Sequence, residues 1–169
     1  MKATGWVLES RLPMSSVAER MFSELPAWQQ MLDRSRELFC DMAPGSRIGL
    51  MRRNGADAGK RAAALFATEA DSPAATLLTW ECGEDGMRAG CASCRHPREL
   101  RLDLLLVADD EALEAISRHL GGDPLTVMKG LIRRGNVLFY VMRTKRELQD
   151  AGYEDFLDSL GLAFLGACR

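Results

Sequence analysis

Apolar residues alternate with polar ones between Leu100 and Leu106, where leucine occupies every second position. A two-residue period places these leucines on one face of a β-strand, so the pattern predicts a strand over a hydrophobic core. An aspartate cap follows, and apolar residues recur at helical spacing over 110–120. An Asp-Pro step then starts another helix at Pro124, which the pattern ends near Gly130.

The N-terminal part of the chain has the pattern of two helices followed by a strand. A capping box at 16–19 starts a first helix, and a longer helix after Pro26 carries an apolar stripe as far as Met42. A short strand is predicted over 47–51. The alanine-rich stretch 59–70 predicts a small helix that covers one end of a sheet.

Two strands over 76–82 and 87–91 are joined by a glycine-containing turn, which predicts a β-hairpin. A loop leads from the hairpin to the strand that begins at Leu100. We therefore expect three successive antiparallel strands in this region.

The apolar segment 137–142 is ambiguous. Its β-branched and aromatic residues favour a strand, whereas the spacing of its large apolar residues favours a helical face. We predict a helix over 137–149. A further amphipathic helix is predicted over 153–167.

The order of these elements over residues 76–148 resembles the C-terminal half of the sterol carrier protein type-two family, which includes carrier-like accessory proteins of ubiquinone biosynthesis. The resemblance is carried by the segments DLLLVADD, EALEAI, GGDPLTVM and GLIRRGN. It implies an α+β fold with a mixed, mainly antiparallel sheet of about five strands, covered by helices on one face. It also implies a helix after Asn136, and an apolar tunnel that holds a lipid, acyl chain or isoprenoid.

Carried over by position, the resemblance implies nine residues that line this tunnel. They are Leu102, Leu104, Leu106, Ile116, Leu120, Met128, Leu131, Phe139 and Met142. The N-terminal residues depart from the family and look like an added helical pair. The predicted organisation is a single domain over 1–169, with a helical extension at 1–43, a sterol-carrier-like core at 44–150 and a C-terminal helix at 151–169.

A second candidate site consists of Cys82, Cys91, Cys94 and His96, in the pattern C-x8-C-x2-C-x-H. Thiolates and an imidazole bind zinc tetrahedrally, and a Cys-x-x-Cys pair supports redox chemistry when one thiol has a lowered pKa. The alternative is that Cys82 is a small buried hydrophobe and that a plain loop follows the hairpin. We assign no metal, with Cys91, Cys94 and His96 as the candidates.

Charge and hydropathy limit the partners. The chain has 22 basic and 24 acidic residues, a net charge of -2, so no overall field recruits nucleic acid. The N-terminus lacks the apolar region of a secretory signal, and five cysteines, an odd number, suggest reduced thiols, so we expect a cytoplasmic protein. Basic residues at 133–134 and 143–146 are a solvated face or a peripheral contact with an anionic membrane.

No catalytic constellation is recognisable, and Asp109 with Asp110 is better explained by helix capping than by paired catalytic carboxylates. Nine methionines suit an adaptable ligand-binding lining, but they also suit an ordinary core. We therefore predict a non-enzymatic protein without a cofactor that binds a hydrophobic small molecule and presents it to a partner enzyme. The alternatives are a metal- or redox-responsive regulator and a protein–protein adaptor.

Overall fold

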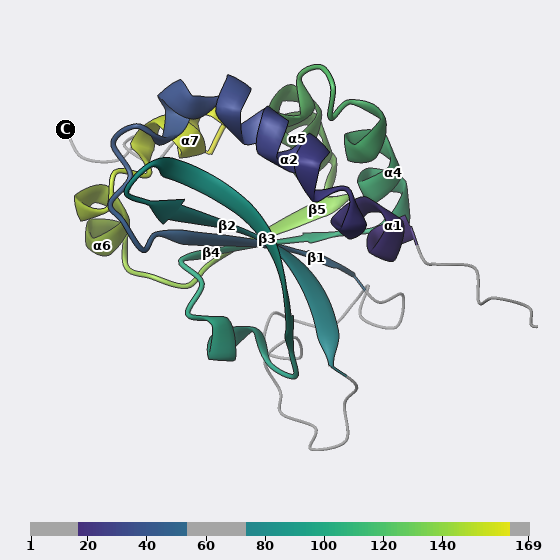
Figure 1. The fold of residues 1–169 in the computed structure, drawn as a ribbon, viewed down its shortest axis with the longest axis horizontal. Helices are drawn as coiled ribbons and strands as arrows, with labels where there is room; N and C mark the ends of the chain where they lie inside the picture. Colours follow the sequence, from purple (N-terminus) through teal and green to yellow (C-terminus); the bar gives the residue numbers. More distant parts are fainter. Residues whose placement is uncertain (1–16, 54–73, 163–169) are drawn as a thin grey trace, which may run out of the picture.

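The computed structural model describes residues 17–53 and 74–162 of the 169-residue chain. The strands in these ranges are β1 (Arg47–Arg52), β2 (Ala75–Gly83), β3 (Gly86–Cys94), β4 (Leu104–Ala108) and β5 (Val137–Val141). The helices are α1 (Val17–Ser23), α2 (Leu25–Arg34), α4 (Asp110–Arg118), α5 (Pro124–Arg134), α6 (Lys145–Asp150) and α7 (Glu154–Ser159), and the short 3-10 helices are η1 (Arg36–Phe39) and η3 (Pro97–Leu100). The predicted α+β class is confirmed (Figure 1).

The strands form one mixed sheet in the order β3-β2-β1-β4-β5. Strands β1 and β4 are parallel, with Gly49 opposite Leu105, and the other three neighbouring pairs are antiparallel. The prediction that the strand after the hairpin extends a run of antiparallel neighbours is wrong, because β4 pairs with β1 and not with β3. The turn through η3 and Arg101, whose φ of 50° is left-handed, carries the chain from the sheet edge to its middle.

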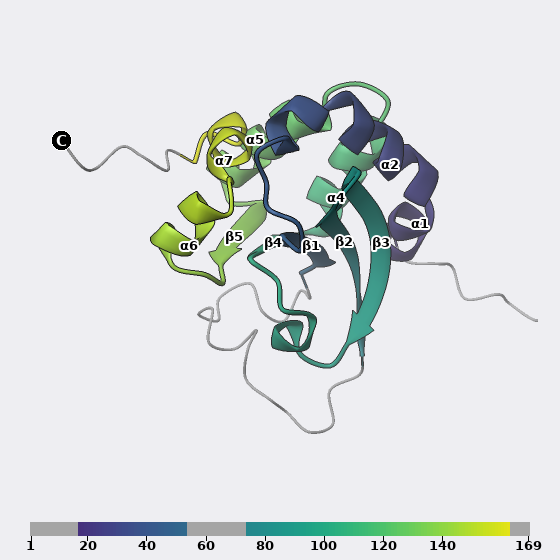
Figure 2. The ribbon, with the colours of Figure 1, turned by 60° about the vertical axis from the view of Figure 1, so that its left-hand side comes forward.

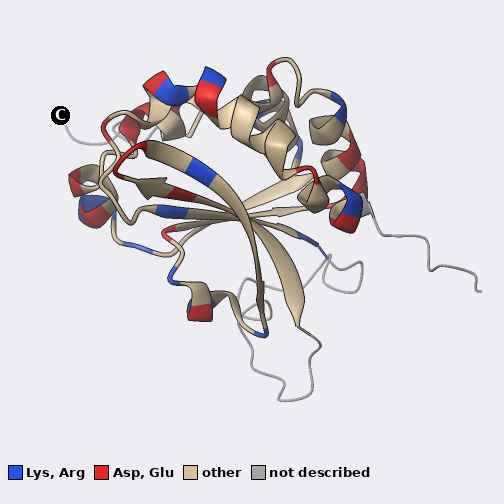
Figure 3. Ribbon diagram, in the orientation of Figure 1, with Lys and Arg blue, Asp and Glu red and all other residues tan. Residues whose placement is uncertain are grey.

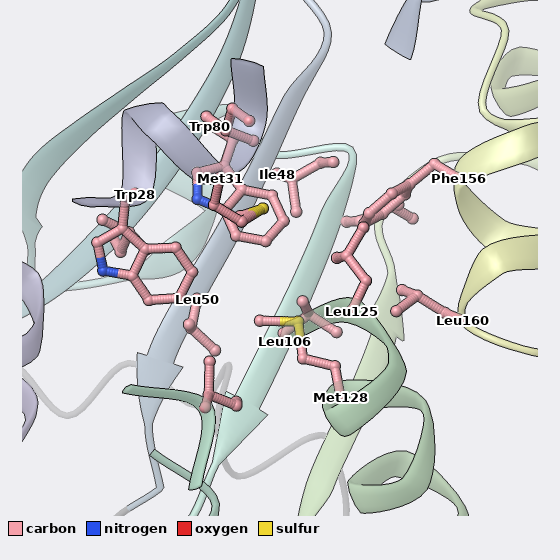
Figure 4. Packing of buried hydrophobic residues seen from close by; sticks show 14 of the residues in the cluster. Trp28, Met31, Ile48, Leu50, Trp80, Leu106, Leu125, Met128, Phe156 and Leu160 are labelled. Carbon is pink, nitrogen blue, oxygen red and sulfur yellow. The ribbon is translucent and has the colours of Figure 1, made fainter. Parts of the chain in front are cut away.

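Helices cover one face of the sheet, as expected, and Figure 2 shows α1, α2, α4, α5 and α7 on the same side of the strands. The main hydrophobic cluster fills the space between these layers and includes Trp28, Trp80, Leu106, Met128 and Phe156 (Figure 4). A second, smaller cluster lies on the opposite face of the sheet, and its buried members are Leu77, Cys94, Leu102, Leu105 and Val107.

The alternating leucines do not form one strand from Leu100. The strand β4 begins at Leu104, whereas Leu100 ends η3 and Leu102 belongs to the cluster on the opposite face. The left-handed backbone of Arg101 interrupts the extended conformation. Side chains before Leu104 therefore do not alternate between the two faces of the sheet as those of a strand do.

Two predicted helices have different ends. The helix after Pro26 stops at Arg34, and η1 then brings the remaining apolar stripe as far as Met42 into the core. The helix that begins at Pro124 continues through Gly130 and ends at Gly135, whose φ of 81° makes it a left-handed C-cap.

The predicted helix over 137–149 is wrong in its first half. Residues Val137–Val141 form β5, which pairs antiparallel with β4 and completes the sheet at that edge. Strand propensity and this pairing together outweigh the helical spacing of the apolar residues. A capping box at Thr144 and Glu147 then begins α6.

Some predictions fall outside the described residues. They are the start of the capping box at Ser16, the helix over 59–70, and the part of the helix over 153–167 that follows residue 162. Within the described part of the chain, each helix is too short or too polar to cross a lipid bilayer.

Candidate functional site

A hollow of about 770 Å³ opens where α2 and η1 meet the turn between β2 and β3. Its floor consists of five apolar residues that are at most 6% exposed and belong to the main core, namely Leu32, Phe39, Met42, Cys82 and Met87. The hollow therefore lies directly over one end of the core between the sheet and the helices.

Charged side chains of both signs surround this floor. Asp33 and Arg36 contribute to the lining from the helical side, and Glu84, Asp85 and Arg88 contribute from the hairpin side. Figure 3 shows acidic positions at the hairpin turn and a basic position on β3 just beyond it. The accessible surface of the hollow is more polar than apolar, because the five apolar residues lie beneath it and the charged rim is exposed.

The hairpin wall of the hollow is fixed to α2 by Gln29. The side-chain amide of Gln29 donates from Nε2 to the carbonyl oxygen of Met87 at 3.0 Å and accepts at Oε1 from the backbone N–H of Ala89 at 2.9 Å. Strand β3 is the outermost strand in the sheet order and pairs with β2. The Gln29 amide therefore bonds to backbone groups on the outer edge of β3. The two walls are therefore held at a defined separation.

The structure brings together seven of the nine residues predicted to line a tunnel. Leu104, Leu106, Ile116, Leu120, Met128 and Leu131 are at most 3% exposed and lie in the main cluster, with Phe139 partly buried against it. Leu102 and Met142 lie in or against the cluster on the opposite face. The seven belong to one hydrophobic cluster, and none of the nine lines the 770 Å³ hollow.

The cysteine candidates do not converge. Cys91 lies opposite Leu78 of the main cluster and donates from Sγ to the carbonyl oxygen of Phe22 at 3.0 Å, whereas Cys94 is buried on the opposite face of the sheet. Burial raises the pKa of both thiols, which disfavours the thiolates that a metal or a redox reaction needs. No group of three or more potential metal ligands occurs in residues 17–53 and 74–162.

Asp109 is a helix cap, as predicted. Its Oδ1 accepts from the backbone N–H of Ala112 at 2.8 Å, and its Oδ2 accepts from Asn136 Nδ2 at 2.9 Å and from Arg53 Nη2 at 3.2 Å. The neighbouring Asp110 forms a bidentate ion pair with Arg52, which lowers the pKa of the carboxyl. These contacts use both carboxylates in structural roles.

Sequence inspection missed a buried carboxylate, Asp103, which is 6% exposed. It accepts hydrogen bonds from the backbone N–H of Arg47 at 2.9 Å, from Arg143 Nε at 2.8 Å and from the Tyr153 hydroxyl at 2.7 Å. These contacts join β1, the segment after β5 and the start of α7. The one sequence signal was an aspartate that interrupts an otherwise apolar run.

The basic residues after the core helices are not brought together. Arg133 and Arg134 end α5, while 143–146 lies beyond the other end of β5. Arg143 is paired with Asp103 and Glu147. The structure therefore gives this group no common surface.

Several residues of the hollow were predicted from the sequence to be buried, but their meeting in one hollow was not predicted. Leu32, Phe39 and Met42 belong to the apolar stripe predicted after Pro26, and Cys82 was considered as a small buried hydrophobe. Their meeting depends on the early end of α2 and on the hairpin folding back against it. No spacing rule in the sequence predicts that juxtaposition.

No protein-family model matches the chain. No curated protein matches it either. Among solved structures, it is similar to the solution structure of the conserved hypothetical protein TT1886, "possibly sterol carrier protein", from Thermus thermophilus, with a TM-score of 0.43, 17% identity and 89% of each chain covered. A likeness of this size does not assign the chain to a family.

Proposed function

We propose that this protein binds a hydrophobic small molecule in the hollow between α2, η1 and the hairpin turn, and that it acts as a carrier or accessory protein, not as an enzyme. The supporting observation is the apolar floor of the hollow, which is continuous with the main core. A ligand that enters between the charged rim residues meets apolar side chains within one layer of the surface.

Size and flexibility favour this function. A hollow of about 770 Å³ falls within the range of about 300–1,000 Å³ that small-molecule pockets occupy. Two of the five floor residues are methionines, whose flexible thioethers adapt to ligands of different shape. Each methylene moved from water onto this floor contributes about 0.8 kcal/mol.

The residues predicted to line a tunnel extend the same proposal. Leu104, Leu106 and Met128 belong to the cluster that also forms the floor. A long acyl or isoprenoid chain reaches them if the floor side chains swing aside.

The test measures the binding of a neutral apolar probe to the full chain. Radiolabelled tridecane and tridecan-7-one are each equilibrated with the protein by dialysis, and native mass spectrometry determines the stoichiometry. We expect one probe molecule per chain. If neither probe binds, the proposal is wrong.

A substitution at the hollow locates the binding site. Cys40 is exposed and lines the hollow, so Cys40→Trp introduces a bulky ring there without removing a core side chain. We expect at least a fivefold loss of probe affinity. The matched control is Ser93→Trp near the other end of β3, outside the lining of the hollow, which should bind like the unmodified protein. Equal loss in both variants contradicts binding in the hollow.

A further inference from the structure

The two tryptophans of the main cluster differ in their hydrogen bonding. Trp28 and Trp80 have ring centroids 5.7 Å apart, and both side chains are at most 1% exposed. Trp28 donates from Nε1 to the carbonyl oxygen of Met21 at 3.0 Å. Among residues 17–53 and 74–162, Trp80 Nε1 is the one buried side-chain polar atom without a hydrogen-bond partner.

An unpaired buried donor needs a reason, since buried tryptophan N–H groups usually find an acceptor. Leaving such a group unsatisfied removes it from water without a replacement bond. The other buried side-chain nitrogen and oxygen atoms in the described part of the chain are paired, as Asp103 and Tyr153 illustrate with their mutual bond of 2.7 Å. Trp80 is thus an exception within a core that otherwise pairs its polar atoms.

The surroundings of Trp80 give a water molecule little support. The ring packs against Trp28 and lies edge-on to Phe156, with centroids 6.2 Å apart. Figure 4 shows Met31 and Ile48 in the same part of the cluster. A buried water requires two to four polar partners, and these neighbours offer apolar surface.

Trp80 lies one layer behind the floor of the hollow. Trp80 and Cys82 project to the same face of β2, because side chains alternate along a strand, and Cys82 lines the hollow. Phe39 also lines it, and its ring centroid is 5.3 Å from that of Phe156, which contacts Trp80. Trp80 itself does not line the hollow, so a ligand in the hollow reaches its N–H only when floor side chains move.

We propose that the ligand is an apolar molecule that carries an uncharged hydrogen-bond acceptor, such as a ketone, ester or quinone carbonyl, and that this oxygen accepts from Trp80 Nε1. The inference rests on the proposed function and specifies its ligand class. A carbonyl satisfies a neutral donor without bringing a charge into the core, whereas a carboxylate placed there loses its hydration. The apolar remainder of the ligand takes over the contacts that the floor side chains make with the core.

The experiment compares two probes that differ only in the acceptor, tridecan-7-one and tridecane. We expect the ketone to bind the unmodified protein roughly fivefold to tenfold more tightly, the effect of one additional hydrogen bond. In a proton–nitrogen correlation spectrum, the ketone should also move the indole N–H resonance of Trp80 downfield. The indole resonance of Trp28, already bonded to Met21, serves as the internal control.

Trp80→Phe removes the donor and keeps an aromatic ring, and it should bind both probes equally. Trp28→Phe is its matched control and should retain the preference for the ketone. If both probes bind the unmodified protein with equal affinity and leave the Trp80 resonance at one position, the inference is wrong while the proposed function stands. If neither probe binds, the proposed function itself fails. The resonance comparison uses unmodified protein, so it decides the question even if a variant does not fold.

Discussion

At the scale of single residues, Asp103 and Tyr153 form a buried polar pair beside the apolar core. Tyr153 is fully buried, and its hydroxyl donates to Asp103 Oδ2 at 2.7 Å. Burial, reinforced by the hydrogen bond to Asp103 and by that carboxylate's charge, raises the pKa of the Tyr153 hydroxyl far above its ordinary value. The folded protein therefore holds this proton more tightly than the unfolded chain does.

This difference predicts a loss of stability in alkali. The unfolded tyrosine releases its proton near pH 10, whereas folded Tyr153 retains it. The stabilisation is complete below about pH 10 and declines as the pH rises above it, by at most about 1.4 kcal/mol per pH unit. Urea unfolding between pH 8 and pH 11 measures this slope.

Tyr153→Phe is the control for that slope. The variant should lose about 1–3 kcal/mol of unfolding free energy at pH 8, because Asp103 loses a buried donor. The difference between the two proteins should then shrink above pH 10. Tyr140 is present in both proteins, so the comparison isolates Tyr153. Parallel pH profiles for the two proteins would show that Tyr153 does not cause the decline.

Residue patterns predicted which side chains are buried better than they predicted the face of the sheet on which those side chains lie. The leucines of β4 and the apolar stripe after Pro26 are buried as expected. The same two-residue period placed Leu100 and Leu102 with Leu104, and this failed because residues 100–103 are not in a strand: Leu100 ends η3, Arg101 is left-handed, and β4 begins only at Leu104. The unpaired Trp80 donor had no sequence signal, since hydrogen bonding depends on three-dimensional neighbours.

At the scale of elements, a close backbone contact joins the turn between α6 and α7 to the segment before β1. Gly152 has a φ of 74°, and a β-carbon there would collide with the backbone carbonyl of Asp41. Ala43 donates its N–H to the carbonyl oxygen of Ala151 at 3.0 Å across the same contact. The C-terminal helices are thus docked against the N-terminal half through backbone atoms.

Gly152→Ala should therefore destabilise the protein by about 2–4 kcal/mol, through left-handed strain and the collision with Asp41. Gly130→Ala is the matched control, because Gly130 lies inside α5 and a β-carbon there meets nothing within 4 Å. That change should stabilise the protein by about 0.5–1 kcal/mol. Chemical denaturation of both variants measures the sign of each change in the free energy of unfolding. An unchanged free energy of unfolding in Gly152→Ala would contradict the close contact.

Element types were predictable where local signals agreed and failed where they competed. The Asp109 cap, the Asp-Pro start of α5 and the hairpin of β2 and β3 all have local causes and are confirmed. The segment Val137–Val141 carries two periods at once, and pairing with β4 selects the strand. Such a decision depends on a neighbour that lies well before it in the chain, which no local window contains.

At the scale of the whole molecule, the parallel pair of β1 and β4 dominates the topology. The hairpin of β2 and β3 is inserted between these two strands in sequence but lies to one side of them in the sheet. The sequence predicted the fold class and the helix-covered face, but the strand order required this long-range pairing. The hollow is a product of the same arrangement, since it forms where the hairpin turn meets α2.

A ligand held between these layers should stabilise the entire fold. Tridecan-7-one at one hundred times its dissociation constant should raise the free energy of unfolding by about 2.7 kcal/mol, because it binds only the folded chain. Thermal unfolding of the full chain with and without the ketone measures the effect. Cys40→Trp should show a smaller gain at the same ketone concentration, and an equal gain would contradict the assigned location.

The side-chain amide of Gln29 also covers part of the outer edge of the sheet. The carbonyl of Met87 and the N–H of Ala89 belong to an edge strand, where unpaired backbone groups are a template for strands of other molecules. By bonding to both groups, this side chain occupies part of the hydrogen-bonding edge that another strand would need. One helix residue thereby both fixes a wall of the hollow and covers part of the outer edge of the sheet.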